Sequence, residues 1–184
     1  TTNPQFTDVT GGAKTVQVEA RNGDAVVASA SAKVTITPVT IKLTANSNDK
    51  VYDGTSLIDT GYSITGTFVG TEGLASVTVE GSQTVVGSSA NTITAYALKP
   101  NTKAVNYSIT TDTGTLTIDP AALTITAKDQ EKYVGQTFSF DGDEFTVSGL
   151  VTGDSVTEVE LTSTGAASSA TVGTYPIVIT EGSA

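Results

Sequence analysis

The side chains that most often perform chemistry are scarce in this sequence. It contains no histidine and no cysteine, so the commonest general bases, nucleophiles and transition-metal ligands are missing. The densest group of acids is Asp141, Asp143 and Glu144. A pair of carboxylates could hydrolyse a glycosidic bond, and their oxygens could bind calcium. However, Asp-Gly-Asp-Glu between two phenylalanine-containing runs is typical of a turn. We therefore predict a turn here, no catalytic residue and only a weak calcium site.

A second candidate is the stretch Tyr52-Asp53-Gly54-Thr55. As a binding site, it would offer an aromatic ring beside a carboxylate to a sugar. As a structural element, Tyr52 would pack at a junction, Asp53 would cap a turn, and Gly54 would adopt a positive φ. Tyr133 and Gly135 repeat the tyrosine and the glycine without the acid. This partial repetition favours the structural interpretation.

A lysine–asparagine isopeptide bond is a third possibility, because such bonds stiffen some surface domains. It requires a lysine, an asparagine and an acid that are buried together. Lys33 and Lys42 lie in predicted strands but occupy the polar positions of the alternation. The pattern therefore gives this cross-link little support.

An internal repeat organises most of the chain. Residues 33–45 read KVTITPVTIKLTA and residues 115–127 read TLTIDPAALTITA, which places Pro38 and Pro120 82 positions apart. Residues 64–70 and 147–153 match further along the chain at a similar offset. Several landmarks that agree within one or two residues indicate two copies of one module.

The two prolines mark the predicted module boundaries. Proline lacks an N–H and fixes φ, which suits the end of a strand. We expect residues 39–120 to form a complete repeat and residues 121–184 a second repeat that is truncated at its C-terminus. The second copy has no counterpart of residues 106–110 or 115–118. Residues 1–38 are expected to supply the closing strands of a preceding repeat, or a short variant of one.

The fold class follows from alternation and composition. Threonine is the commonest residue type, at 35 of 184, and β-branched residues suit a pleated surface. Short apolar/polar runs recur about every 10–15 residues and are separated by glycine, aspartate and asparagine, which is typical of strands. We predict an all-β, elongated tandem array of small sandwich or β-grasp-like domains. Residues 149–159 could form a short helix, but a loop is favoured. The apolar residues of the predicted strands, which are expected to face inward, are Val34, Ile36, Ile41, Leu43, Tyr62, Ile64, Phe68, Val77, Val79, Ile93, Ala95, Leu116, Ile118, Leu123, Ile125, Phe138, Phe140, Phe145, Val147, Val156, Val159, Ile177 and Ile179.

Charge and hydropathy limit the possible partners. The net charge is −10, and the basic residues are scattered, so a nucleic-acid partner is not expected. No apolar run reaches the 18 residues of a membrane-spanning helix. No cofactor is implied, apart from the weak calcium candidate.

These motifs resemble a known group of repeats. Residues 50–55 (KVYDGT) resemble the signature of YDG-type repeats, whereas residues 132–135, 145–154 and 172–177 resemble the related MBG repeats. The resemblance covers residues 39–184. The second copy departs from it, with Tyr-Val-Gly where Tyr-Gly or Tyr-Asp-Gly is usual. Both groups occur in tandem in large bacterial surface proteins, and no catalytic residue is known in them.

The resemblance implies an extracellular position on the bacterial cell surface and contact with adjacent repeats of the same chain. We expect a non-enzymatic stalk that projects a distal binding domain. The alternative is an adhesin module that itself binds a host glycan or matrix protein. An accessory domain of a carbohydrate-active enzyme is less favoured, because the sequence has no tryptophan to stack on a sugar.

Overall fold

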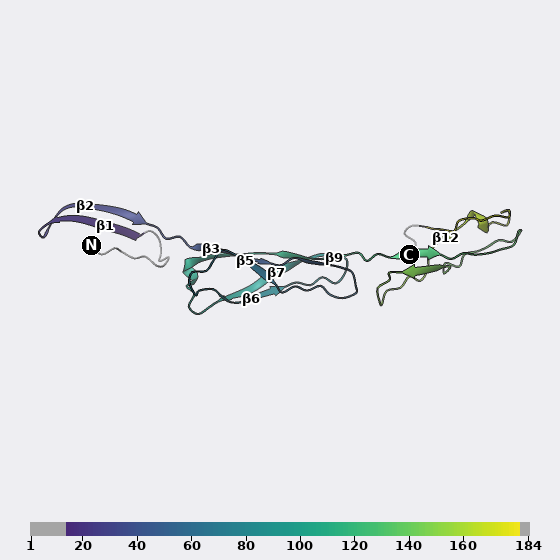
Figure 1. The fold of residues 1–184 in the computed structure, drawn as a ribbon, viewed down its shortest axis with the longest axis horizontal. Coiled ribbons are helices and arrows are strands. Elements are labelled where there is room, and N and C mark those ends of the chain that lie inside the picture. Colours follow the sequence, from purple (N-terminus) through teal and green to yellow (C-terminus); the bar gives the residue numbers. More distant parts are fainter. Residues whose placement is uncertain (1–13, 181–184) are drawn as a thin grey trace. The chain divides into compact units, whose positions relative to one another are not determined.

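The computed structural model describes residues 14–180, and its regular secondary structure consists almost entirely of strands (Figure 1). This confirms the predicted all-β class. The described strands are β1 (Lys14–Asn22), β2 (Ala25–Val34), β3 (Val39–Ala45), β4 (Asn48–Val51), β5 (Tyr62–Thr65), β6 (Leu74–Glu80), β7 (Gly87–Leu98), β8 (Tyr107–Asp112), β9 (Gly114–Asp119), β10 (Thr124–Ala127), β11 (Phe145–Ser148), β12 (Leu161–Thr162) and β13 (Val178–Ile179). Among the described residues, the only helical segments are two 3₁₀ turns, η1 (Ala104–Asn106) and η2 (Thr164–Ala166). Residues 149–159 form the predicted loop.

The chain divides into two compact units. One unit comprises residues 1–48, 57–83 and 88–117, and the other comprises residues 49–56, 84–87 and 118–184. The outermost parts of the first and last predicted segments, residues 1–13 and 181–184, lie outside the described residues.

Strands β1 and β2 form an antiparallel hairpin that opens at Lys14↔Val34 and closes at Asn22↔Ala25. Every residue of β2 is exposed, and Val18 and Val27 of the hairpin are each more than 60% exposed. A two-stranded hairpin without a buried face is marginally stable in water. The hairpin therefore presents apolar side chains to solvent that a sheet would normally bury.

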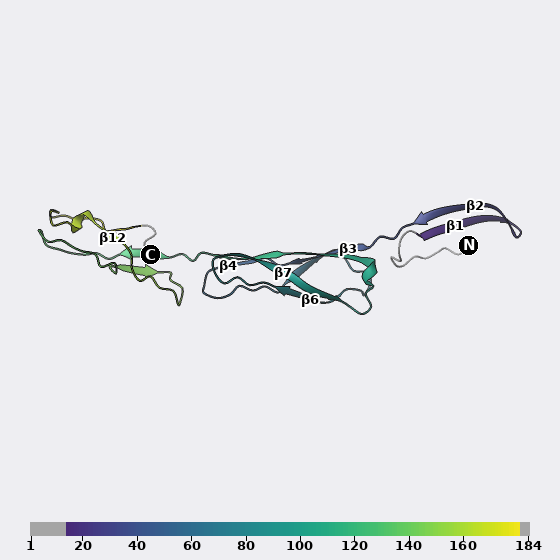
Figure 2. The same cartoon turned by 180° about the vertical axis from the view of Figure 1, so that it is seen from behind.

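Residues 39–120 contain a three-stranded sheet, ordered β5-β3-β8, and a four-stranded sheet, ordered β4-β9-β7-β6. Figure 2 shows β4, β7 and β6 from behind. Strand β3 pairs antiparallel with β5 and parallel with β8. Together with the absence of a long helix among the described residues, this arrangement favours the sandwich form of the prediction over the β-grasp form.

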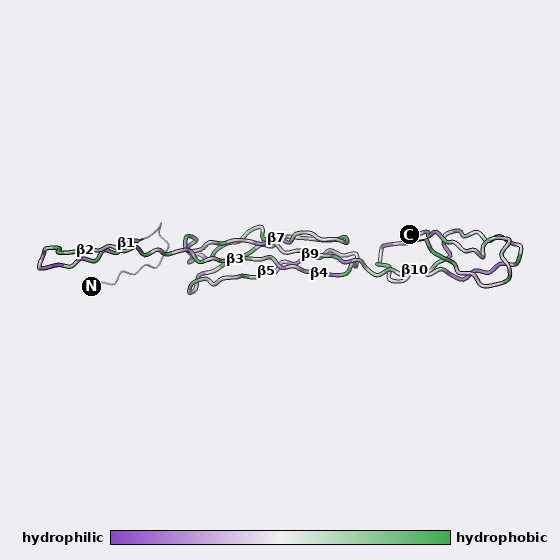
Figure 3. Tube along the Cα trace, turned by 90° about the horizontal axis from the view of Figure 1, so that it is seen from above, coloured by the Kyte–Doolittle hydropathy of each residue, from purple (hydrophilic) through white to green (hydrophobic). Residues whose placement is uncertain are grey.

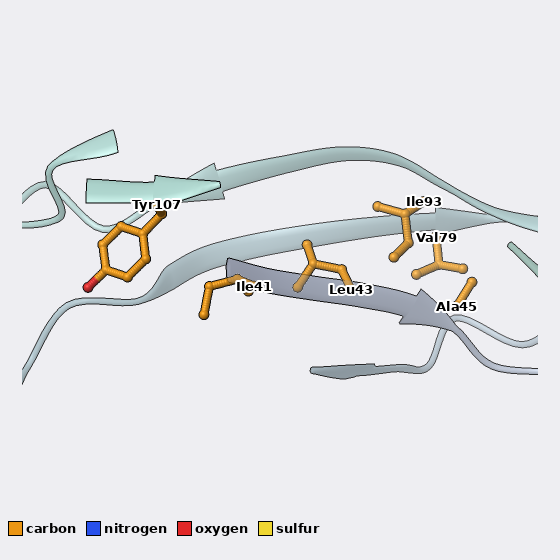
Figure 4. Packing of buried hydrophobic residues seen from close by; sticks show 6 residues of the cluster. All are labelled: Ile41, Leu43, Ala45, Val79, Ile93 and Tyr107. Atoms are coloured by element: carbon orange, nitrogen blue, oxygen red, sulfur yellow. The ribbon is translucent and has the colours of Figure 1, made fainter. Parts of the chain in front are cut away.

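The core of the first unit lies between strands from both sheets. Ile41, Leu43 and Ala45 from β3 pack in one buried cluster with Val79 from β6, Ile93 from β7 and Tyr107 from β8 (Figure 4). Ile41 and Leu43 are fully buried. The alternation of apolar residues on β3 therefore places one face of the strand in the core, as the period of two requires.

Tyr107 closes one end of this core. Its ring lies 4.8 Å from that of Phe68, its hydroxyl donates to the Glu72 carboxylate, and the N–H of Val69 donates to the same hydroxyl at 2.9 Å. Burial, and then the neighbouring Glu72 carboxylate, raise the pKa of the Tyr107 hydroxyl. The neutral phenol thus ties the loop before β6 to β8.

Residues 121–180 repeat only part of this plan. Strand β10 pairs with β11, as β3 pairs with β5, and β12 pairs with β13, as β6 pairs with β7. Apolar and polar stretches alternate along the trace here as elsewhere (Figure 3). The runs at 138–140 and 156–159, however, lie outside every strand. The prediction of strands there was wrong: Phe138 and Val159 donate backbone hydrogen bonds to Ala166 and Gly142, but alternation alone does not supply the repeated pairing of a strand.

Candidate functional site

The acidic group Asp141, Asp143 and Glu144 forms a turn. Gly142 has φ +86°, and the Glu144 carboxylate accepts the N–H groups of Asp141 and Gly142 at 3.0 and 3.1 Å. These backbone donors, the N–H of Asp141 first, lower the pKa of the Glu144 carboxyl. Strand β11 follows this turn and pairs with β10 rather than with the 138–140 run. Within residues 14–180, no three acidic side chains gather in a way that could hold a metal ion.

The Tyr52–Thr55 stretch is a second turn, closed by side chains. One carboxylate oxygen of Asp53 accepts the backbone N–H of Thr55 at 2.9 Å and the Lys50 ammonium at 2.6 Å. Lys50, and then Thr55, lower the pKa of the Asp53 carboxyl. Gly54 has φ +79°, a conformation that favours glycine. The acid therefore has its oxygen engaged within the turn, as the structural interpretation predicts.

Tyr133 and Gly135 occupy the corresponding turn of the second copy. Gly135 has φ +87°. The N–H of Tyr133 donates to the Gln136 side chain at 3.1 Å, and the Lys132 ammonium donates to the carbonyl oxygens of Gln136 and Ala167, both at 2.7 Å. Both copies thus turn at a glycine with a positive φ and use a lysine hydrogen bond, although the bonds that close the two turns differ. Tyr133 itself is 82% exposed.

The two prolines lie at the ends of strands. Pro38 directly precedes β3 and Pro120 directly follows β9, and both are exposed. Neither proline therefore removes a hydrogen bond from a sheet interior. Two of the passages that the chain makes between the sheets are very short: from β3 to β4 through residues 46–47, and from β8 to β9 through Thr113 alone.

These two passages lie side by side. We call residues 39–51 the incoming segment and residues 107–119 the outgoing segment. The parallel β3–β8 register runs from Val39↔Tyr107 to Thr44↔Asp112. Beyond it, the N–H of Thr115 donates to the Ser47 hydroxyl at 3.0 Å, and the N–H of Tyr52 donates to the carbonyl of Asp119 at 2.8 Å. The nearly constant offset indicates that both segments run together in one direction across the two sheets.

Asn91 on β7 binds the incoming segment at the point where it passes between the two sheets. It was not predicted as a site residue. It is fully buried, and its side-chain amide donates to the carbonyl oxygens of Asn46 and Asp59, both at 2.9 Å. Gly114 lies beside the carbonyl of Asn46, because a Cβ added at Gly114 would stand 2.1 Å from the Asn46 oxygen. We call Asn46, Ser47, Asn91 and Gly114 the crossing junction.

The lysines proposed for an isopeptide bond lie elsewhere. Lys42 on β3 forms an exposed salt bridge of 2.5 Å with Asp112 on β8. Such a surface pair contributes at most about 1 kcal/mol. The buried asparagine of the module, Asn91, directs its amide at two backbone carbonyls.

The fold defines a small all-β repeat module built from two sheets, with structural turns where the sequence suggested sites. In a comparison with protein families, residues 123–184, which contain most of the second copy, match the MBG domain of the YGX type. This agrees with the resemblance predicted from the sequence. No curated protein and no solved structure matches the chain.

One further property concerns membranes. Among residues 14–180, no helix has the length and apolar character required to cross a bilayer.

Proposed function

We propose that residues 39–120 are a force-bearing structural module in the stalk of a bacterial cell-surface protein, where they carry a distal binding region away from the cell. The observation that carries this proposal is the parallel pairing of the incoming and outgoing segments. These two segments receive any tension transmitted along the chain, since they lead to Pro38 and Pro120.

The parallel pairing of β3 and β8 determines how the module responds to a pulling force. A pull toward the N-terminus draws β3 backward, whereas a pull toward the C-terminus draws β8 forward through β9. The two strands are then loaded in shear, so the hydrogen bonds of the register from Val39↔Tyr107 to Thr44↔Asp112 share the load. If both pulls acted at the same end of the pair, the bonds would break one after another. Shear loading therefore favours a role in resisting tension.

Two other features support this role. Force at Pro120 reaches β8 only through β9, which lies between β4 and β7 in its sheet. At the crossing junction, the Thr115 N–H joins the two segments through the Ser47 hydroxyl, Gly114 lies against the Asn46 carbonyl, and Asn91 holds that carbonyl from β7. The match of residues 123–184 to the MBG domain, together with the resemblance of residues 39–120 to YDG-type repeats, supports display outside the cell.

The test is a comparison of two pulling directions by single-molecule force spectroscopy on the full chain. The protein has no cysteine, so introduced thiols define the attachment points. T37C with A122C would load the module in shear, and T37C with V105C would peel β3 from β8. The three positions are exposed. We expect the unfolding force in shear to exceed the peeling force several-fold at one loading rate. Equal forces would contradict the proposal.

A further inference from the structure

The sequence contains a single aspartate–proline bond, and that bond lies at the boundary between the two copies. Of the five prolines, only Pro120 follows an aspartate, whereas Pro38 at the preceding boundary follows Thr37. Strand β9 ends at Asp119, and both Asp119 and Pro120 are exposed. The side-chain carboxyl of an aspartate lies so near its own backbone carbonyl carbon that attack closes a small ring, and proximity of this kind accelerates an intramolecular reaction.

A backbone donor is positioned at this carbonyl. The N–H of Tyr52 donates to the carbonyl oxygen of Asp119 at 2.8 Å. Tyr52 directly follows β4, which borders β9 in the four-stranded sheet. Attack on the carbonyl carbon places negative charge on that oxygen, and an N–H that already points at the oxygen stabilises the charge. The neighbouring strand thus supplies an oxyanion donor.

The proline side of the bond is not held by a sheet. The nitrogen of proline has no N–H and donates no hydrogen bond to a ladder. Residues 120–123 lie between β9 and β10 and belong to neither strand. Asp119, in contrast, is the last residue of β9 and is bonded to Tyr52. The bond therefore joins a fixed acyl group to a leaving segment that no strand pairing retains.

We propose that the chain cleaves itself between Asp119 and Pro120 under mildly acidic conditions. A side-chain oxygen of Asp119 bonds to the backbone carbonyl carbon of the same residue, and the C–N bond to Pro120 breaks. The proline nitrogen leaves as a secondary amine and takes the proton that the carboxyl carried. Water then opens the cyclic anhydride, which restores the side-chain carboxyl and leaves Asp119 as a new C-terminus. One water is consumed for each bond broken, and the reaction is independent of the force-bearing role.

Acid is required because the departing nitrogen needs a proton. An ordinary aspartate carries that proton at and below about pH 4. The charged side chains on β4 and in the turn that follows it are Asp49, Lys50 and Asp53, and Lys50 forms an ion pair of 2.6 Å with Asp53. Strand β7, on the other side of β9, has no charged side chain along its length. Asp119 is the only charged residue of β9, so the acid dependence is assigned to its carboxyl.

The test incubates the full chain at several pH values between 7 and about 4 and measures intact masses under denaturing conditions. Circular dichroism identifies the pH values at which the chain is folded. Wild type should yield residues 1–119 and 120–184, with a summed mass one water above that of the parent, and faster at lower pH. D119T copies the Thr37–Pro38 boundary and should stay intact. D119E must close a larger ring and should cleave more slowly by about tenfold or more.

A second aspartate–proline bond in the same chain isolates the contribution of Tyr52. T37D places this dipeptide at Pro38, and no backbone N–H among residues 14–180 donates to the carbonyl of residue 37. In this variant, the bond at Pro120 should break faster than the bond at Pro38 by about tenfold or more. Equal rates would overturn the proposal, because the ordinary lability of the dipeptide would then explain the cleavage. The proposal also fails if wild type stays intact wherever it is folded, or if cleavage at Pro120 survives D119T.

Discussion

Replacing Asn91 with aspartate should lower the free energy of unfolding at pH 7 by about 3–5 kcal/mol, the usual cost of an unpaired buried charge. The substitution removes the amide that donates to the carbonyls of Asn46 and Asp59 and directs a carboxylate at two oxygens. Burial and the absence of donors should raise the pKa of the new carboxyl. The deficit should therefore be largest when the carboxyl is ionised and should shrink as the pH falls and the carboxyl becomes protonated.

Urea unfolding at pH 7 and at about pH 4, near the ordinary aspartate value, measures both effects. N101D is the matched control, because Asn101 is exposed and its amide bonds only the Thr71 hydroxyl. It should change stability by less than about 0.5 kcal/mol. A deficit below 1 kcal/mol for N91D, or one that grows on acidification, would show that Asn91 does not hold the junction.

Gly114→Ala should destabilise the module by about 3 kcal/mol or more, at the upper end of the range for overpacking. The added Cβ would stand 2.1 Å from the carbonyl oxygen of Asn46 and 2.6 Å from that of Ala45. Both atoms are backbone in the incoming segment, so relief requires the two segments to move apart. The requirement at Gly114 is for space and does not come from a positive φ.

G73A provides the comparison, since Gly73 is also buried and has no positive φ. Its Cβ would meet only the flexible Lys99 side chain, at 3.6 Å. Thermal unfolding should separate the two variants clearly, with G73A close to wild type. Equal melting temperatures would mean that the junction tolerates separation of the segments.

Much of the fold could be predicted from local pattern. Alternation locates β3, β7 and β9, and proline marks the strand ends at Pro38 and Pro120. Gly54 has the positive φ that was predicted, and Gly135 in the corresponding turn also has a positive φ. These features depend on neighbours in sequence, which a single chain displays directly.

Features that depend on residues far apart in the sequence were harder to predict. Tyr62 and Ile64 were expected to face inward but are 38% and 43% exposed. They lie on β5, an edge strand of its sheet, while the core is centred on β3. Asn91 shares an alternating face with the buried Ile93, which was a usable signal. Its partners, however, are loop carbonyls 45 and 32 positions away, and no sequence pattern reveals them.

The two copies differ in their strand pairing. The incoming and outgoing segments supply the shear pair in residues 39–120, whereas the described part of the second copy contains a β3-like and a β4-like region without a parallel partner. If parallel pairing resists tension, the two copies should differ mechanically despite their common plan.

The most direct test extends the full chain from its two ends and records each length increase. We expect one high-force event that releases the 82 residues from Val39 to Pro120, a contour length of roughly 280 Å. The second copy should extend at much lower force. High-force events of similar size from both copies, or none from residues 39–120, would contradict the claim that the parallel pair bears the load.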